Sequence, residues 1–404
     1  MDHLRSLLSI LVPTLVLAFA TLPAPLTAQF RETVEIEPGE RCPTGMTEIR
    51  PQRCMAPEFE PPFITDYHPR SMLVTEETAT PRAKFPVVDV HGHTRGFAGG
   101  VSTLNEMIGH LDDLNIQVYI SADNVTGDRL RQALDAIEAS PHSERFRVMA
   151  GIEFDGVGTP GWAERAARQL DEDLSAGAVA LGEVSKSFGM TLRKADGSRL
   201  RVDDPELDPI WETVARHDVP AFIHTAEPPA FFEPLDLENE RWLELALFPN
   251  RRKYGPDNVS FEQLMEERNN LFRRHPETTF IAAHFGWHGN DLERAGALLD
   301  EFPNVYYEVG AVLYEFGRQP RAAREFFIEY QDRILFGKDS FQPSEYPYFY
   351  RVFETTDEYF DYYRDYHAFW KMYGMNLPDD VLRKLYYENA LRLMDGLPRE
   401  GFPE

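Results

Sequence analysis

Cysteine is the scarcest residue in this sequence of 404 residues: only Cys42 and Cys54 are present, and both lie near the N-terminus. The segment between them contains proline and glycine, and no histidine lies near either of them in the sequence. In an oxidising compartment this arrangement predicts one disulfide bond, and it argues against a metal or redox pair. The chemistry of the remaining chain must therefore come from other side chains.

Positive charge is also scarce. Lysine and arginine number 41 against 67 aspartates and glutamates, which gives a formal net charge of -26. Because an acidic surface repels phosphate backbones and anionic lipid headgroups, we expect neither nucleic acid nor a membrane surface as a partner. A small molecule is the expected partner, and the composition leaves open whether identical chains assemble into an oligomer.

Long apolar runs are confined to the N-terminus. A charged start, Met1 to Arg5, is followed by the apolar run Leu7 to Leu22 and by the small residue Ala28. This pattern predicts a signal peptide over residues 1–28 and therefore a secreted or periplasmic protein. A membrane anchor is the alternative, but the run is shorter than the ~20 apolar residues of a spanning helix and contains Pro13.

The motifs of several enzyme classes are missing. We find no Gly-x-Ser-x-Gly stretch, which argues against a Ser-His-Asp hydrolase. Glycine-rich phosphate loops and cysteine-rich metal knuckles are absent as well.

Two regions follow the predicted signal peptide. Residues 29–84 are rich in proline and acids and predict an N-terminal extension that contains the cysteine pair. Residues 85–397 alternate short apolar runs with amphipathic stretches, which is typical of strand-helix units around a parallel sheet. The predicted strands are Val87–His91, Ile116–Ser121, Arg147–Ile152, Ala178–Val184, Ala221–His224, Thr279–His284, Val305–Val309 and Ile334–Phe336. The predicted helices are Ser102–Leu114, Asp128–Ala139, Trp162–Ala176, Leu207–His217, Phe261–Arg274, Asp291–Glu301 and Arg321–Gln331.

Eight strand-helix units predict a (β/α)8 TIM barrel with an N-terminal extension, since this fold typically needs ~250 residues. A doubly wound open sheet is the alternative. It would not explain why polar residues follow so many of the predicted strands.

Histidines and acids stand at the ends of these strands. His91 and His93 share one face of the first strand, because side chains at i and i+2 point the same way. His224, His284 and Asp339 follow the fifth, sixth and eighth strands. Each histidine taken alone would be a hydrogen-bonded core residue, but together they predict a site for a divalent metal, with zinc as the expected ion.

This pattern resembles the amidohydrolase superfamily of metal-dependent hydrolases, and it is most similar to the amidohydrolase-related branch, which also contains decarboxylases. The similarity covers about Phe85 to Leu397. The resemblance implies that His91, His93 and Asp339 hold a first ion and that His224 shares this ion or binds a second. His284 would then be a ligand of the second ion or, in a one-metal enzyme, a hydrogen-bond donor to the substrate.

Glu183, at the end of the fourth strand, distinguishes one ion from two. A carboxylate here can bridge two cations, as in the similar TatD-type hydrolases. Lys186 is close enough to suggest the carboxylated lysine of other superfamily members, but it is out of phase on a strand. The remaining interpretation of Glu183 is a buried acid paired with an arginine.

The predicted function is hydrolysis of a C-N, C-O or lactone bond of a small molecule. A divalent ion lowers the pKa of bound water from ~16 toward ~7, and Asp339 is expected to accept that proton and pass it to the leaving group. A metal-dependent decarboxylase and a non-catalytic small-molecule-binding barrel are the alternatives.

Substrate contacts are expected from the long loops after the fifth and eighth strands. Arg251 and Arg252 are candidates to clamp a substrate carboxylate, although adjacent arginines are more often solvated charges. The aromatic residues after the eighth strand predict either stacking on a substrate ring or packing of helices within Thr355 to Tyr373 onto the barrel.

Overall fold

The computed structural model describes residues 33–367 and 369–403, so the predicted signal peptide and its cleavage near Ala28 lie outside the described residues. The chain forms two compact units, one up to Arg70 and one from Ser71. In the first unit β1 (Thr33–Glu35), β3 (Arg53–Met55) and β2 (Thr47–Arg50) form an antiparallel sheet in that order. A disulfide joins Cys42 to Cys54, with 5.6 Å between their Cα atoms.

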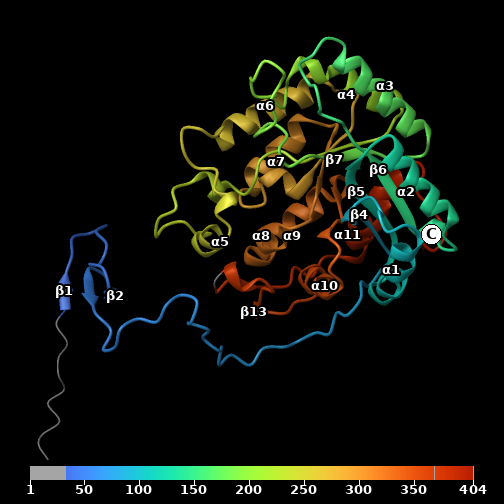
Figure 1. The fold of residues 1–404 in the computed structure, drawn as a ribbon. Helices are drawn as coiled ribbons and strands as arrows, with labels where there is room; N and C mark the ends of the chain where they lie inside the picture. Colours follow the sequence, from blue (N-terminus) through green and yellow to red (C-terminus); the bar gives the residue numbers. More distant parts are fainter. Residues whose placement is uncertain (1–32, 368, 404) are drawn as a thin grey trace, which may run out of the picture. The chain divides into compact units, whose positions relative to one another are not determined.

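The second unit is the predicted (β/α)8 barrel, which is thereby confirmed (Figure 1). The last barrel strand is split into β11 and β12, of which β11 pairs with β10 and β12 pairs with β4. The backbone N–H of Val90 also donates to the carbonyl of Phe336 between the two halves (3.1 Å), so the sheet closes. In chain order the strands are β4 (Val87–His93), β5 (Ile116–Val125), β6 (Phe146–Ala150), β7 (Leu181–Val184), β8 (Ala221–Ile223), β9 (Phe280–Ala282), β10 (Val305–Glu308), β11 (Ile334–Leu335) and β12 (Asp339–Ser340).

Amphipathic helices follow the strands and surround the sheet (Figure 1). In α1, Leu104, Met107, Leu111 and Leu114 are buried at helical spacing, which is the pattern from which the helices were predicted. The predicted helices are confirmed as α1 (Val101–Leu114), α2 (Asp128–Ala139), α3 (Trp162–Ser175), α4 (Asp208–Arg216), α6 (Phe261–Arg274), α7 (Leu292–Glu301) and α9 (Pro320–Glu329), and α11 (Asp379–Arg383) and α12 (Asn389–Leu393) follow the last strand.

Three loops at the carboxyl ends of the strands contain short elements of their own. The loop after β8 holds α5 (Trp242–Leu247), the loop after β10 holds α8 (Leu313–Arg318), and the loop after β12 holds α10 (Tyr346–Glu354). The helices predicted within Thr355–Tyr373 are wrong: this segment pairs β13 (Phe360–Asp361) with β14 (Lys371–Met372). The helix ends at Glu354 because Thr355 is extended and its hydroxyl donates to the carbonyl of Arg351 (2.7 Å).

Within the described residues, no helix has both the length and the apolar character needed to cross a bilayer.

Candidate metal centre

The strand-end histidines and acids come together at one end of the barrel. His91 and His93 are on β4, Glu183 is on β7, and Asp339 is on β12. The pairing of β12 with β4 places Asp339 opposite Gly92, between the two histidines of β4. His224 directly follows β8, and His284 follows β9 in a short helical turn. The structure thus brings together all six residues predicted as metal ligands.

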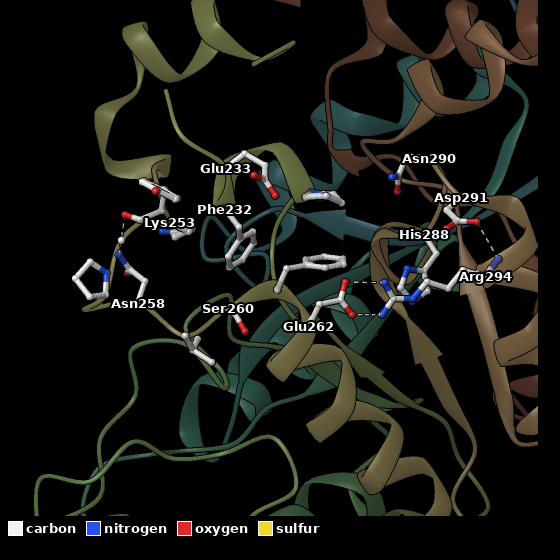
Figure 2. Close-up of a pocket in the computed structure, with 16 residues that line it drawn as sticks. Phe232, Glu233, Lys253, Asn258, Ser260, Glu262, His288, Asn290, Asp291 and Arg294 are labelled. Carbon is white, nitrogen blue, oxygen red and sulfur yellow. Dashed lines mark hydrogen bonds and ion pairs between the residues drawn. The ribbon is translucent and has the colours of Figure 1, made fainter. Parts of the chain in front are cut away.

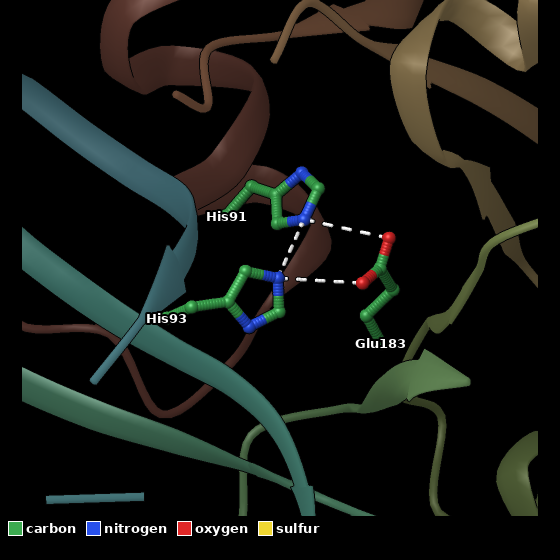
Figure 3. A group of neighbouring side chains, drawn as sticks. All are labelled: His91, His93 and Glu183. Carbon is green, nitrogen blue, oxygen red and sulfur yellow. Dashed lines mark hydrogen bonds and ion pairs between the residues drawn. The ribbon is translucent and has the colours of Figure 1, made fainter. Parts of the chain in front are cut away.

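His91, His93 and Glu183 form the first half of the cluster (Figure 3). The Nε2 atoms of His91 and His93 are 3.2 Å apart. Glu183 places Oε1 3.5 Å from His91 Nε2 and Oε2 3.3 Å from His93 Nε2. Asp339 Oδ1 lies 3.9 Å and 3.4 Å from the same two nitrogens. Gly92 is required between the histidines, because a Cβ atom there would overlap the ring of Tyr119.

Glu183, His224 and His284 form the second half. Glu183 Oε1 is 2.8 Å from His224 Nδ1 and 3.4 Å from His284 Nε2. The two histidine nitrogens are 3.1 Å apart. The backbone at His284 and Asp339 has φ angles of 55° and 83°, a strained conformation for residues other than glycine that is concentrated at functional sites.

Each histidine is held by an acceptor on its outer ring nitrogen. His91 Nδ1 is 3.0 Å from Glu308 Oε2, and His93 Nδ1 is 3.1 Å from Asp123 Oδ1. His224 Nε2 and His284 Nδ1 each lie 2.9 Å from a backbone carbonyl. Because an ionised carboxylate or a carbonyl only accepts, the outer nitrogens donate, and in the neutral form of each histidine the inner nitrogen presents a lone pair.

These lone pairs explain why the cluster fits divalent cations. In neutral histidines, the four inner nitrogens face one another and the oxygens of Glu183 and Asp339 at 2.8 to 3.9 Å. Such an array of acceptors is repulsive unless protons or metal ions lie within it. Two ligands of one tetrahedral zinc ion are separated by about 3.3 Å, so the spacing suits metal ions.

Protons and metal ions compete for this cluster. Burial lowers the pKa of His93, but hydrogen bonds with Asp123 and Glu183 outweigh it and raise the pKa to about 9. Burial raises the pKa of Glu183, but the positive charges of His224 and His91 hold it well below its usual range. Metal binding is therefore expected to release protons.

Two supporting carboxylates were missed in the sequence. Glu308, fully buried at the end of β10, accepts from His91, from the backbone N–H of His284 at 3.2 Å and from the backbone N–H of Gly310. Asp123 accepts from His93 and from the hydroxyl of Ser121 at 2.6 Å. Glu308 could have been found because it also ends a strand, whereas Asp123 lies within β5, a strand that was predicted to end at Ser121.

We expect Asp123→Asn to weaken metal binding. The amide cannot carry the negative charge that orients His93, and loss of such a partner typically costs about 10- to 100-fold in metal affinity. Competition with a chelator would measure the change. Asp173→Asn is the matched control, because Asp173 is a buried acid that accepts from Thr126 and Gly127. Equal affinities in both variants would contradict this role of Asp123.

The predicted substrate contacts Arg251 and Arg252 lie in the loop after β8. Arg251 donates to Glu244 at 2.5 Å, and Arg252 donates to the carbonyl of Leu245 at 2.9 Å. Both are thus engaged within their own loop. Among the described residues, neither has a hydrogen bond or ion pair with the metal cluster.

A cavity of about 570 Å³ lies beside the same loop (Figure 2). Lys253 and Asn258 lie on one side of it, His288 and Arg294 on the other, and Phe232 between them. None of the predicted metal ligands lines this cavity. The segment 284–288 borders both regions, because Trp287 contacts the rings of His224 and His284 and the next residue lines the cavity.

Fold and site define a class: a TIM-barrel metal-dependent enzyme with a histidine and carboxylate cluster at the carboxyl ends of its strands. The family profile described as Amidohydrolase matches residues 88–395. The chain therefore belongs to the amidohydrolase family. No curated protein matches the sequence.

Several solved structures are similar to this chain. An uncharacterised TIM-barrel protein of Bordetella bronchiseptica is 15% identical, with a TM-score of 0.48 over 76% of this chain and 98% of its own. A dihydroxybenzoic acid decarboxylase of Polaromonas, with bound manganese, is 15% identical, with a TM-score of 0.49 over 76% and 96%. The 5-carboxyvanillate decarboxylase of Sphingomonas paucimobilis is 14% identical, with a TM-score of 0.45 over 77% and 99%. Likeness at this level does not assign a reaction to this chain.

Proposed function

We propose that this enzyme hydrolyses a C-N, C-O or lactone bond of a small molecule and that Glu183 would help to hold two divalent ions. The position of Glu183 carries the proposal. Its Oε2 faces His93, and its Oε1 faces His224 and His284 at 2.8 and 3.4 Å and lies 3.5 Å from His91. His91, His93 and Asp339 would hold one ion, and His224 and His284 would hold the second.

Divalent ions bound here would act as Lewis acids, because such ions polarise a carbonyl group and lower the pKa of bound water. Asp339 and His93 are the most exposed of the six side chains, at 19% and 26%, so the substrate is expected to approach from their side. Burial raises the pKa of Asp339, but the nearby charges of His91 and Lys186 outweigh it and lower the pKa below the usual range. Asp339 is thus an ionised acceptor for the proton of the attacking water at neutral pH.

The inner nitrogen of His284 is turned toward Glu183 and His224. Its outer nitrogen donates to the carbonyl of Gly310, so in this tautomer the inner nitrogen has no proton to offer. This favours a ligand role for His284 over donation to the substrate.

Decarboxylation of a carboxylated substrate is the second candidate, and Lys186 favours it. Desolvation lowers the pKa of Lys186, but the carboxylates of Asp339 and Glu183 outweigh this and raise it. Lys186 therefore remains a cation beside the cluster and can attract a substrate carboxylate. Decarboxylation is also the reaction named for two of the structurally similar proteins.

Metal removal and product analysis together test both reactions. We expect zinc or another divalent ion in the purified protein by elemental mass spectrometry, and loss of turnover after chelation that added zinc or manganese restores. Small amides, lactones and aromatic acids would serve as substrates. Addition of water to the products supports hydrolysis, and release of carbon dioxide supports decarboxylation. Turnover that survives complete chelation would contradict both.

A further inference from the structure

A buried arginine lies in the loops above the barrel. Arg241, after β8, is only 3% exposed. Its Nη1 donates to Glu244 at 2.6 Å and to His367 Nε2 at 2.8 Å. Its guanidinium carbon lies 4.3 Å from the ring centre of Tyr314 and 5.0 Å from that of Trp370. We call these five residues, together with Tyr362, the Arg241 cluster.

One edge of the Arg241 guanidinium has no partner. Its Nε and Nη2 atoms are buried and form no hydrogen bond among the described residues. These two atoms lie on the same edge of the planar group, because Nη1 is the nitrogen on the side of Cδ. This edge presents two parallel N–H groups, the geometry that binds a carboxylate through both of its oxygens.

Two more buried donors belong to the same cluster. Nε2 of His367 lies 2.8 Å from Arg241 and 3.1 Å from the Glu244 carboxylate. A guanidinium only donates, so in the tautomer in which Nε2 accepts the shorter of these bonds, Nδ1 carries the ring proton. That Nδ1 and the hydroxyl of Tyr362 are buried without partners in the part of the chain that the structure describes. The rings of Tyr362 and His367 stack with their centres 5.3 Å apart. Such a group of unsatisfied donors is rare in native proteins, and it suits an acceptor that arrives from outside the chain.

The existing carboxylate does not satisfy Arg241 completely. Glu244 also accepts from Arg251 at 2.5 Å and lies 3.1 Å from His367 Nε2. It therefore serves two guanidinium groups while the other edge of Arg241 stays free. The chain has a net charge of -26, which repels anions from most of its surface. A buried guanidinium with two free N–H groups is therefore a specific place for an anion to bind.

The Arg241 cluster lies on the same face as the metal centre. Its members belong to the loops that follow His224, Glu308 and Asp339, and loops after barrel strands form the catalytic face. Tyr314 follows Gly310, whose carbonyl holds His284. Arg251, which shares Glu244 with Arg241, is also close enough to Lys186 for its positive charge to oppose the rise in the pKa of Lys186.

We propose that Arg241 anchors the carboxylate of a small anionic ligand, with His367 and Tyr362 as further donors and Trp370 and Tyr314 as its aromatic surroundings. The inference rests on the proposed function in that this ligand is the substrate. It defines the substrate class as a carboxylate with an apolar or aromatic body.

Benzoate is the probe, and benzamide is its neutral counterpart. Calorimetric titration of the full-length protein as purified is expected to show binding of benzoate and little binding of benzamide. Arg241→Lys keeps the charge but removes the two-pronged edge, so we expect benzoate affinity to fall on the order of 10- to 100-fold. Tyr362→Phe keeps the ring but removes the hydroxyl, and it is expected to lower the affinity for benzoate roughly two- to tenfold.

Arg145→Lys is the matched control, because Arg145 is a mostly buried arginine that is already paired with Asp112 at 2.8 Å and with the carbonyls of Ile116 and Gln117, none of which belongs to the Arg241 cluster. Its benzoate affinity should stay close to that of the wild type. Unfolding midpoints without ligand separate loss of binding from loss of the fold, and Tyr362→Phe provides the test if Arg241→Lys does not fold.

Equal benzoate affinity in wild type, Arg241→Lys and Tyr362→Phe would overturn the proposal, as would equal binding of benzamide. These measurements require no turnover. A protein without metal or activity that still binds benzoate through Arg241 would contradict the proposed function and leave the anchor intact.

Discussion

Glu183→Gln is expected to reduce the metal content from two ions per chain to one or none and to abolish most of the turnover. The amide has one oxygen and no negative charge, so it cannot join the His91–His93 side of the cluster to the His224–His284 side. Lewis-acid stabilisation is worth several kcal/mol, and each 1.36 kcal/mol is a factor of ten, so we expect kcat to fall on the order of 10³-fold. Elemental mass spectrometry and steady-state kinetics on the same preparations would measure both changes.

Glu227→Gln makes the same chemical change at the edge of the cluster. Glu227 Oε2 lies 3.9 Å from the outer nitrogen of His224 and is not directed at the inner nitrogens. We expect this variant to keep its metal. One ion per chain in the wild type, unaffected by Glu183→Gln, would make Glu183 a structural residue and favour decarboxylation.

Asp339→Asn is expected to lower kcat on the order of 10²- to 10⁴-fold, the range of general acid-base catalysis, with KM changed only a few-fold. Asparagine keeps an oxygen close to His93 but cannot accept the proton of the attacking water. Kinetics at saturating and limiting substrate would separate the two parameters, and metal analysis would confirm that the cluster is still loaded.

Asp357→Asn controls for the integrity of the loop after β12. Asp357 is buried in that loop and accepts from Thr78 and Arg351, at 2.6 and 2.7 Å. Its replacement is expected to affect stability more than kcat. An unchanged kcat in Asp339→Asn would rule out the proton transfer assigned to this residue.

The barrel and the meeting of the six candidate ligands could be predicted because both depend on local pattern. The alternation of strands and helices can be recognised in segments such as Thr279–His284 and Phe261–Arg274. The apolar residues have a period of two in strands and of about 3.6 in helices. A residue at the carboxyl end of a barrel strand lies on the catalytic face whatever its neighbours are. His224 and His284 were therefore located by position alone.

The helices expected after Thr355 show the limit of this reasoning. Aromatic residues such as Phe360 and Tyr362 are compatible with either a helix or a strand, and their density does not distinguish the two. The hydroxyl of Thr355 and the pairing of β13 with β14 decide the outcome.

The sequence by itself determined the fold, the family and which side chains would meet at the ends of the strands, because these follow from periodicity and from the positions where strands end. Only the tertiary structure decided how the five other candidate ligands are arranged around Glu183, that Glu308 and Asp123 support the histidines, and that Arg241 has a free edge. The partners in these contacts are far apart in the chain: Glu308 meets His91 across 217 positions, and Arg241 meets His367 across 126. No local pattern encodes such a contact, since it exists only after the barrel closes and brings separate loops to one face.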